Sequence, residues 1–166
     1  MKVKFYRCPV CGNIITKMHD GGIIPVCCGK EMQELKANVT DGKQEYHVPV
    51  VEKKDDCHLH VKIGKEPHPM SKEHHIGWIF LETCDKDGHH GGRFVWLEND
   101  DKPEHTFCVC PTKVVNVYEY CNLHGLWKLE IPASHFKTDD AEKCGTYPAF
   151  CGRRPANPQE EYYSCD

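Results

Sequence analysis

Short runs of apolar and β-branched residues recur through the middle of the chain, without a helical period. Seven such runs, most of them rich in Val, Ile, Phe, Tyr and Trp, occupy residues 47–51, 58–63, 76–81, 93–97, 106–110, 114–120 and 126–131. Turn-forming residues separate them, as at Asp87-Gly88 and Gly91-Gly92. Short strands divided by turns are typical of β-sandwiches and barrels. The pattern therefore predicts a mostly β domain of seven strands.

Both ends of the chain differ from this strand pattern. The N-terminal stretch has dense cysteines and turn signals, and a polar segment at 37–42 reads as a linker. A segment of about 35 residues rarely builds a sufficient core without a metal, disulfides or oligomerisation. After Pro132, repeated prolines interrupt a segment with three further cysteines. We predict a small metal-binding domain over 1–37, a β domain over 38–131 and an irregular C-terminal extension of unknown role over 132–166.

Charge and hydropathy exclude two classes of partner. The 166 residues carry a formal charge of −4, from 21 basic and 25 acidic side chains, which argues against a general nucleic-acid binder. No apolar run approaches the roughly 20 residues needed to cross a bilayer. The N-terminus has no signal-peptide apolar core. We therefore expect a cytoplasmic protein with no nucleic-acid or membrane partner.

The candidate chemistry comes from cysteine and histidine. The chain has 12 of each. In a secreted protein, so many cysteines would indicate disulfides, but without a signal peptide metal thiolates are the better interpretation. Thiolate and imidazole are common ligands of iron and zinc.

Two cysteine pairs near the N-terminus predict the first metal site. Cys8 and Cys11 form a CxxC motif, and Cys27 and Cys28 are adjacent. Four thiolates can hold iron or zinc in a tetrahedral site, and the residues alone do not choose between these metals. Two neighbouring cysteines on one ion must distort either the backbone or the tetrahedron. A structural zinc knuckle and a redox dithiol with two bystander cysteines are the alternatives.

Three separated segments predict a second metal site. They read EYHVP at 45–49, HPMSKEH at 68–74 and CNLHGLW at 121–127, and each lies near a strand end or in a loop. Loops on a rigid β scaffold commonly carry functional residues. The candidate ligands are four histidines and one cysteine: His47, His68, His74, His124 and Cys121.

These motifs resemble a known family. CPVCG followed by VCCG is similar to desulforedoxin and to the N-terminal domain of desulfoferrodoxin, over residues 1–36. This resemblance implies an Fe(Cys)4 centre, with zinc possible, often in a homodimer. The three later segments resemble the superoxide reductase domain of desulfoferrodoxin and neelaredoxin, and both resemblances together span residues 1–131.

The second resemblance implies a fold, a site and a reaction. The fold is a seven-stranded immunoglobulin-like β-barrel. The four histidines would lie in one plane around Fe(II), with the Cys121 thiolate axial and the opposite position open. The reaction would be one-electron reduction of superoxide to hydrogen peroxide, with electrons from a rubredoxin-like donor. Glu45 matches the family glutamate that approaches the ferric iron in the resting oxidised state.

One position departs from the family pattern. The family usually reads E-K-H, and this chain reads Glu45-Tyr46-His47. The family lysine is thought to steer superoxide and aid its protonation. A cation near the iron raises the local concentration of a small anion. Tyr46 cannot do this, although its hydroxyl could donate a hydrogen bond. Lys72 is a candidate substitute, and we expect altered steering.

Other histidines have simpler interpretations. Motif spacing selects His74 as the ligand, and His75 should face the other way. His58 and His60 share a face of one strand, where an exposed polar face is expected more than a metal site. The His89-His90 pair is expected at a hairpin tip. The tryptophans Trp78 and Trp127 are expected in the core or in the wall of the site.

The remaining cysteines are expected to be ordinary thiols. Cys108 and Cys110 point to one face of a strand and are interpreted as two buried thiols. Cys57 and Cys84 are interpreted as reduced thiols. We expect Cys144, Cys151 and Cys165 neither to bind metal nor to form disulfides, since a cytoplasmic setting disfavours disulfides.

Two other functions fit parts of the sequence. The chain could be an electron-transfer iron protein whose second site is inactive or weakened, and Tyr46 is the only support for this. It could also be a structural or sensor protein with zinc in the four-cysteine site. Metal analysis with visible spectroscopy separates these alternatives from a superoxide reductase.

Overall fold

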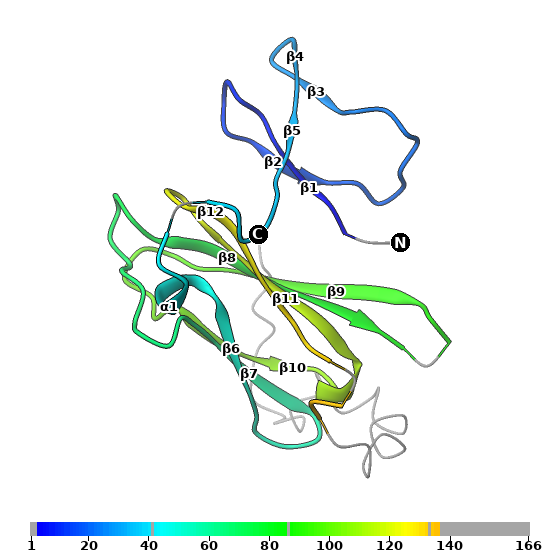
Figure 1. Cartoon of the computed structure of the whole chain (residues 1–166), viewed down its shortest axis with the longest axis vertical. Helices are drawn as coiled ribbons and strands as arrows, with labels where there is room; N and C mark the ends of the chain where they lie inside the picture. The colour runs from blue at the N-terminus through cyan, green and yellow to red at the C-terminus, as the bar shows by residue number, and fades with distance from the viewer. Residues whose placement is uncertain (1–2, 41, 86, 133, 137–166) are drawn as a thin grey trace, which may run out of the picture.

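A computed structural model describes residues 3–40, 42–85, 87–132 and 134–136 (Figure 1). The N-terminal part contains only short strands. A three-stranded sheet has the order β2-β1-β5, from β2 (Ile14–Thr16), β1 (Phe5–Arg7) and β5 (Gln33–Glu34). A separate hairpin pairs β3 (Val26–Cys27) with β4 (Lys30–Glu31). The segments between these strands carry Cys8, Cys11 and Cys28, and Cys27 is the last residue of β3.

The second part is a sandwich of two antiparallel sheets. One sheet has the order β10-β7-β6, from β10 (Glu104–Cys108), β7 (His58–Ile63) and β6 (Pro49–Lys53). The other has the order β12-β11-β8-β9, from β12 (Gly125–Glu130), β11 (Val114–Cys121), β8 (Ile76–Cys84) and β9 (His90–Trp96). A one-turn helix α1 (Gln44–His47) precedes β6, and a short 3-10 helix η1 (Pro111–Lys113) precedes β11.

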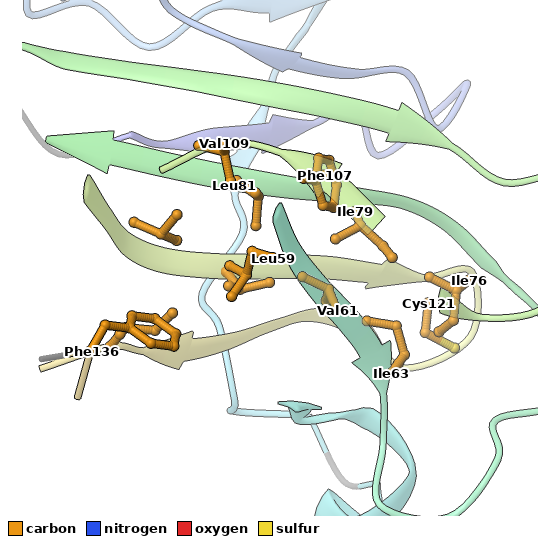
Figure 2. Close-up of a cluster of buried hydrophobic side chains, with 13 residues drawn as sticks. Leu59, Val61, Ile63, Ile76, Ile79, Leu81, Phe107, Val109, Cys121 and Phe136 are labelled. Carbon is orange, nitrogen blue, oxygen red and sulfur yellow. The ribbon is translucent and has the colours of Figure 1, made fainter. Parts of the chain in front are cut away.

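The main core lies between the two sheets (Figure 2). Strand β7 shows how one face of a sheet contributes to this core. Its residues Leu59, Val61 and Ile63 are fully buried, and the residues between them are half-exposed. Side chains alternate across a strand, so this period-two pattern gives the sheet one apolar face. Burying each such side chain stabilises the fold by roughly 1.5–3 kcal/mol. The core supplies the rigid frame on which the site loops stand.

A second apolar cluster joins the N-terminal part to the sandwich. Phe5 of β1 packs against the outer face of the four-stranded sheet, where it contacts Trp78, Phe80 and Tyr118. The connecting segment is also fixed, because Asn38 hydrogen-bonds through its side chain to both the backbone N–H and the carbonyl of Lys128 on β12.

The predicted mostly β fold is confirmed, and the seven expected strands are present with shifted ends. The first run differs most. Residues 44–47 form a helical turn closed by the Val48 N–H donating to the Gln44 carbonyl, and the strand starts at Pro49. The residue before a proline avoids the helical region, so Val48 is extended and the turn ends there.

The expectations about the C-terminal extension cannot be compared with the fold. Residues 137–166, with Cys144, Cys151 and Cys165, lie outside the described residues. Phe136, the last described residue, is buried in the main core. None of the helices in the described ranges is long and apolar enough to span a membrane.

Two candidate metal centres

The four N-terminal cysteines meet at one point. Their sulfur atoms all lie within 4.8 Å of one another. Cys11 Sγ is 3.6 Å from Cys27 Sγ, which is 3.9 Å from Cys28 Sγ. Cys8 is fully buried, whereas Cys11 and Cys28 are exposed. This arrangement has the ligand number and type of a tetrahedral thiolate site for iron or zinc.

The backbone carries the distortion expected of two adjacent ligands. Cys28 has φ +51°, in the left-handed region that residues with a side chain rarely adopt. This conformation turns the Cys28 sulfur back toward its neighbour.

Local hydrogen bonds prepare Cys8 to bind a cation. The backbone N–H groups of Cys11 and Val10 both point at Cys8 Sγ, and they lower the pKa of that thiol to about 6. A lowered pKa favours the thiolate, which is the form that binds metals. Hydrogen bonding to the Cys11 and Cys8 sulfurs and burial raise the pKa of Cys27. Without a metal, the Cys8 thiol therefore ionises more readily than the Cys27 thiol.

The second group collects five residues from three segments. Its ligand atoms lie within 4.8 Å of one another, and its members are His47, His68, His74, Cys121 and His124. His47 ends α1, His68 and His74 bound the loop before β8, and Cys121 ends β11. His124 lies in the turn between β11 and β12. The site thus forms at one end of the sandwich, where the strands stop.

The four histidine rings are arranged as a square. Neighbouring ring centroids are 4.6–4.9 Å apart in the order His47, His68, His74, His124 and back to His47. The diagonal between His47 and His74 is 6.4 Å. The ratio of diagonal to side is close to that of a square. Cys121 Sγ lies 3.6 Å from His124 Nδ1 and supplies the fifth donor.

Hydrogen bonds set the histidine tautomers. His68 Nδ1 is 2.6 Å from the Pro69 carbonyl oxygen, so this nitrogen donates and His68 Nε2 keeps its lone pair. That Nε2 atom and His74 Nε2 are buried, and no described residue hydrogen-bonds to them. Buried polar atoms normally have partners. Two unpartnered nitrogens that face a ring of other donors fit a bound metal ion.

The imidazoles and the thiol respond to burial in ways that suit a metal. Burial and the neighbouring imidazoles lower the pKa values of His47 and His68 to about 4, so both rings are neutral at pH 7. Neutral imidazole is the metal-binding form. Burial raises the pKa of Cys121, while the backbone N–H groups of His124 and Leu123 lower it. The thiolate therefore needs a cation beside it.

One wall of the site contains further buried polar groups. The Trp127 ring stacks on His47, with centroids 4.7 Å apart and planes 16° apart. Glu119 is fully buried beneath them, and its Oε1 atom is 3.6 Å from His47 Nδ1. Burial raises the pKa of this carboxyl well above its usual range. The motif search missed Glu119, because it stands where strand alternation calls for an apolar residue.

Comparisons with known proteins match both parts of the chain. A family model described as desulfoferrodoxin matches residues 39–130, and one described as the desulfoferrodoxin N-terminal domain matches residues 1–35. The chain belongs to the desulfoferrodoxin family. The resemblance stated from the motifs is thus confirmed.

Individual relatives cover most of the chain. The desulfoferrodoxin of Syntrophotalea carbinolica is 43% identical over 129 residues, which are 78% of this chain and 97% of that protein. The superoxide reductase of Pyrococcus abyssi is 40% identical over 55% of this chain and 90% of its own length. The solved superoxide reductase of Treponema pallidum has a TM-score of 0.62 and 29% identity, covering 78% of this chain and 98% of its own.

The three residues expected beside the second centre have different surroundings. Glu45 is exposed, and it lines a cavity of about 510 Å³ together with Lys65 and His135. Lys72 is exposed on its loop. Tyr46 is half-buried, and the Lys43 Nζ atom lies 5.8 Å from the centroid of its ring.

Lys43 was not singled out from the sequence, yet it lies close to the site. A β-carbon on the preceding Gly42 would be 3.0 Å from Trp127 and 3.4 Å from His47 Nε2, so this backbone runs against both rings. Lys43 directly follows Gly42 in the chain. A cation on the face of Tyr46 is a second candidate, beside Lys72, for the missing lysine.

The simpler histidine interpretations agree with the structure. His75 is outside the five-residue group, and its Nδ1 hydrogen-bonds the Ser71 carbonyl. His58 and His60 pair with Asp55 and Thr106 instead of sharing a metal group. His89 and His90 lie at the β8–β9 turn. Asp85, Asp87 and His89 also cluster there, in a turn closed by the Asp85 carboxylate.

One cysteine expectation is wrong. Cys108 and Cys110 are disulfide-bonded and half-exposed, not two buried thiols. The alternation of buried and half-exposed residues continues past the end of β10: Phe107 and Val109 fill the core, so Cys108 and Cys110 face outward. Cys57 and Cys84 are not disulfide-bonded, as expected.

Proposed function

We propose that this member of the desulfoferrodoxin family is a superoxide reductase that works at a mononuclear iron held by His47, His68, His74, His124 and Cys121. The observation that supports this most is the square of four imidazoles with one buried cysteine sulfur beside it. Four nitrogens and one sulfur would hold the iron and leave it free to take one small ligand. Bound iron would supply the one electron that superoxide needs.

The chain's own residues would control access and charge. Trp127 and the Gly42 backbone exclude water from one side of the histidine square. The backbone N–H of His124 donates to Cys121 Sγ, at 3.4 Å, and so moderates the negative charge of the thiolate. Superoxide gains one electron and two protons to become hydrogen peroxide, and the protons come from solvent at the open face.

The four-cysteine centre is proposed as an Fe(Cys)4 site that relays electrons, with zinc as the alternative occupant. The clustering of Cys8, Cys11, Cys27 and Cys28 supports a metal there without selecting it. A small rubredoxin-like protein would be the external donor, in the cytoplasm. Metal analysis decides the occupant, because ferric Fe(Cys)4 absorbs visible light and zinc does not.

A homodimer through the N-terminal part is also proposed. Six large apolar side chains are exposed there: Val10, Ile15, Met18, Ile23, Ile24 and Val26. Exposed apolar side chains in such number are typical of an interaction surface. Sedimentation of the wild type and of Ile23→Lys tests this, and a monomeric wild type would refute it.

Product analysis tests the reaction. Fully reduced protein is mixed anaerobically with superoxide, and both peroxide and oxygen are measured. We expect one peroxide for each electron delivered and no oxygen. Oxygen equal to half of the superoxide consumed would indicate a dismutase. Unchanged superoxide, with both metals present, would favour an electron-transfer protein. Metal-free protein is the control.

A further inference from the structure

Three buried polar groups beside His47 have no hydrogen-bond partner among the described residues. They are His47 Nδ1, both carboxyl oxygens of Glu119, and Trp127 Nε1. Glu119 lies directly opposite Trp127 in the β11–β12 pairing, so both side chains share the inner face of the sheet. An unpaired buried carboxyl destabilises a fold, and its retention calls for an explanation.

Strand alternation makes Glu119 unusual. Along β11, Val117, Glu119 and Cys121 are all fully buried. Val117 packs in the apolar core, and Cys121 is a proposed iron ligand. Glu119 stands between them, where an apolar side chain would satisfy packing at lower cost.

The other buried glutamate of the same sheet is satisfied. Glu82 on β8 hydrogen-bonds Asn116, Tyr118 and His90. Burial of a carboxyl in this sheet therefore does not by itself leave it unpaired. What distinguishes Glu119 is its neighbour, because its Oε1 atom lies 3.6 Å from Nδ1 of His47, a proposed iron ligand.

His68 has a hydrogen bond to a backbone carbonyl that His47 lacks. The His68 ring is held by its Nδ1–H donating to the Pro69 carbonyl, which leaves Nε2 to face the other ligands. No described backbone carbonyl does this for His47. Histidine ligands of metals almost always donate their second nitrogen to a carboxylate, a carbonyl or water, and that bond fixes the ring's tautomer and orientation.

We infer that Glu119 is a positioning residue for the proposed iron site: its carboxyl accepts a hydrogen bond from His47 Nδ1–H and so directs His47 Nε2 at the metal. The 3.6 Å separation is slightly long for a hydrogen bond, and such contacts often tighten only in the occupied site. The inference rests on the proposed function, because it takes His47 as a ligand.

Metal affinity and stability, measured separately, test this inference. The full-length protein is loaded anaerobically with Fe(II), and a chelator competes for the iron. Occupancy of the five-residue site is read after oxidation from its broad thiolate-to-iron band. We expect Glu119→Leu to weaken Fe(II) binding about 10–100-fold at that site. Glu119→Gln should retain most of the affinity, because its amide oxygen still accepts a hydrogen bond.

If Glu119 served only to stabilise the fold, Glu119→Leu would be less stable than the wild type. We expect no such loss. Without metal, Glu119→Leu should unfold at the same or higher denaturant concentration than the wild type, because it removes an unpartnered buried carboxyl. The matched control Glu82→Leu breaks a satisfied network and should lower the stability without changing Fe(II) affinity. Equal affinity of Glu119→Leu and wild type, or an equal loss in Glu82→Leu, would overturn the inference.

One measurement needs no variant. Nitrogen-15 NMR of the zinc-loaded wild type reports the His47 tautomer, and we expect the proton on Nδ1. A proton on Nε2 would overturn the inference even if Glu119→Leu does not fold. If the wild type gives no thiolate-to-iron band after loading, the proposed function fails together with the inference. A normal wild-type band with an unaffected variant refutes the inference alone.

Discussion

Replacing Phe5 by alanine should separate the stability of the fold from the chemistry of the second centre. Phe5 is 2% exposed and touches four rings, with centroids 5.0–6.2 Å away. Removing a buried phenylalanine side chain costs about 3–5 kcal/mol. Phe5→Leu keeps most of the buried area but loses aromatic pairs worth about 0.5–1.5 kcal/mol each, so its cost should be intermediate.

Denaturant unfolding of the metal-loaded protein measures this effect. The midpoint should fall in the order wild type, Phe5→Leu, Phe5→Ala. The matched control Phe94→Ala removes a ring that is 38% exposed and contacts the same cluster, and it should cost less than Phe5→Ala. The thiolate-to-iron band of the second centre should not change, because Phe5 touches none of its ligands. A loss below 1 kcal/mol for Phe5→Ala would show that the cluster does not hold the two parts together.

Three further outcomes are expected. His47 and His68 have pKa values of about 4 in the folded chain against an ordinary 6.5. Between these pH values the unfolded chain binds more protons, so the metal-free protein should keep its full stability above pH 6.5 and lose several kcal/mol toward pH 4. A flat profile of stability against pH would contradict this. Lys43→Gln should lower the superoxide rate constant severalfold at low salt and flatten its ionic-strength dependence in pulse radiolysis, more than Lys72→Gln does; the opposite order would return the steering role to Lys72. Cys28→Ser should change the visible spectrum of the four-cysteine centre and leave the five-residue site intact, and loss of both signals would mean that the centres do not form independently.

The strands and the ligand groups could be predicted because they depend on local patterns. Alternation along 58–63 fixed which face is buried, and the spacing of the HPMSKEH motif selected His74 over His75. The helical turn before Pro49 was missed because a four-residue turn has no period to detect.

Features that depend on long-range contacts were not predictable. Glu119 is opposite Trp127 and near His47 only after three segments have come together. Lys43 is notable only because its Nζ atom lies over the Tyr46 ring, and the spacing of Cys108 and Cys110 does not identify them as disulfide-bonded. In each case the sequence contained the residue, but the partner that gives it a role comes from tertiary structure.

The junction at Asn38 has a consequence for electron flow. A flexible tether would let the two centres meet by diffusion, at an effective concentration set by its length. Here Asn38 is bonded to Lys128, one residue beyond the tryptophan that walls the second site. Within one chain, the separation between the centres is therefore a property of the folded state. Transfer between them should follow a single distance-determined rate, insensitive to solvent viscosity.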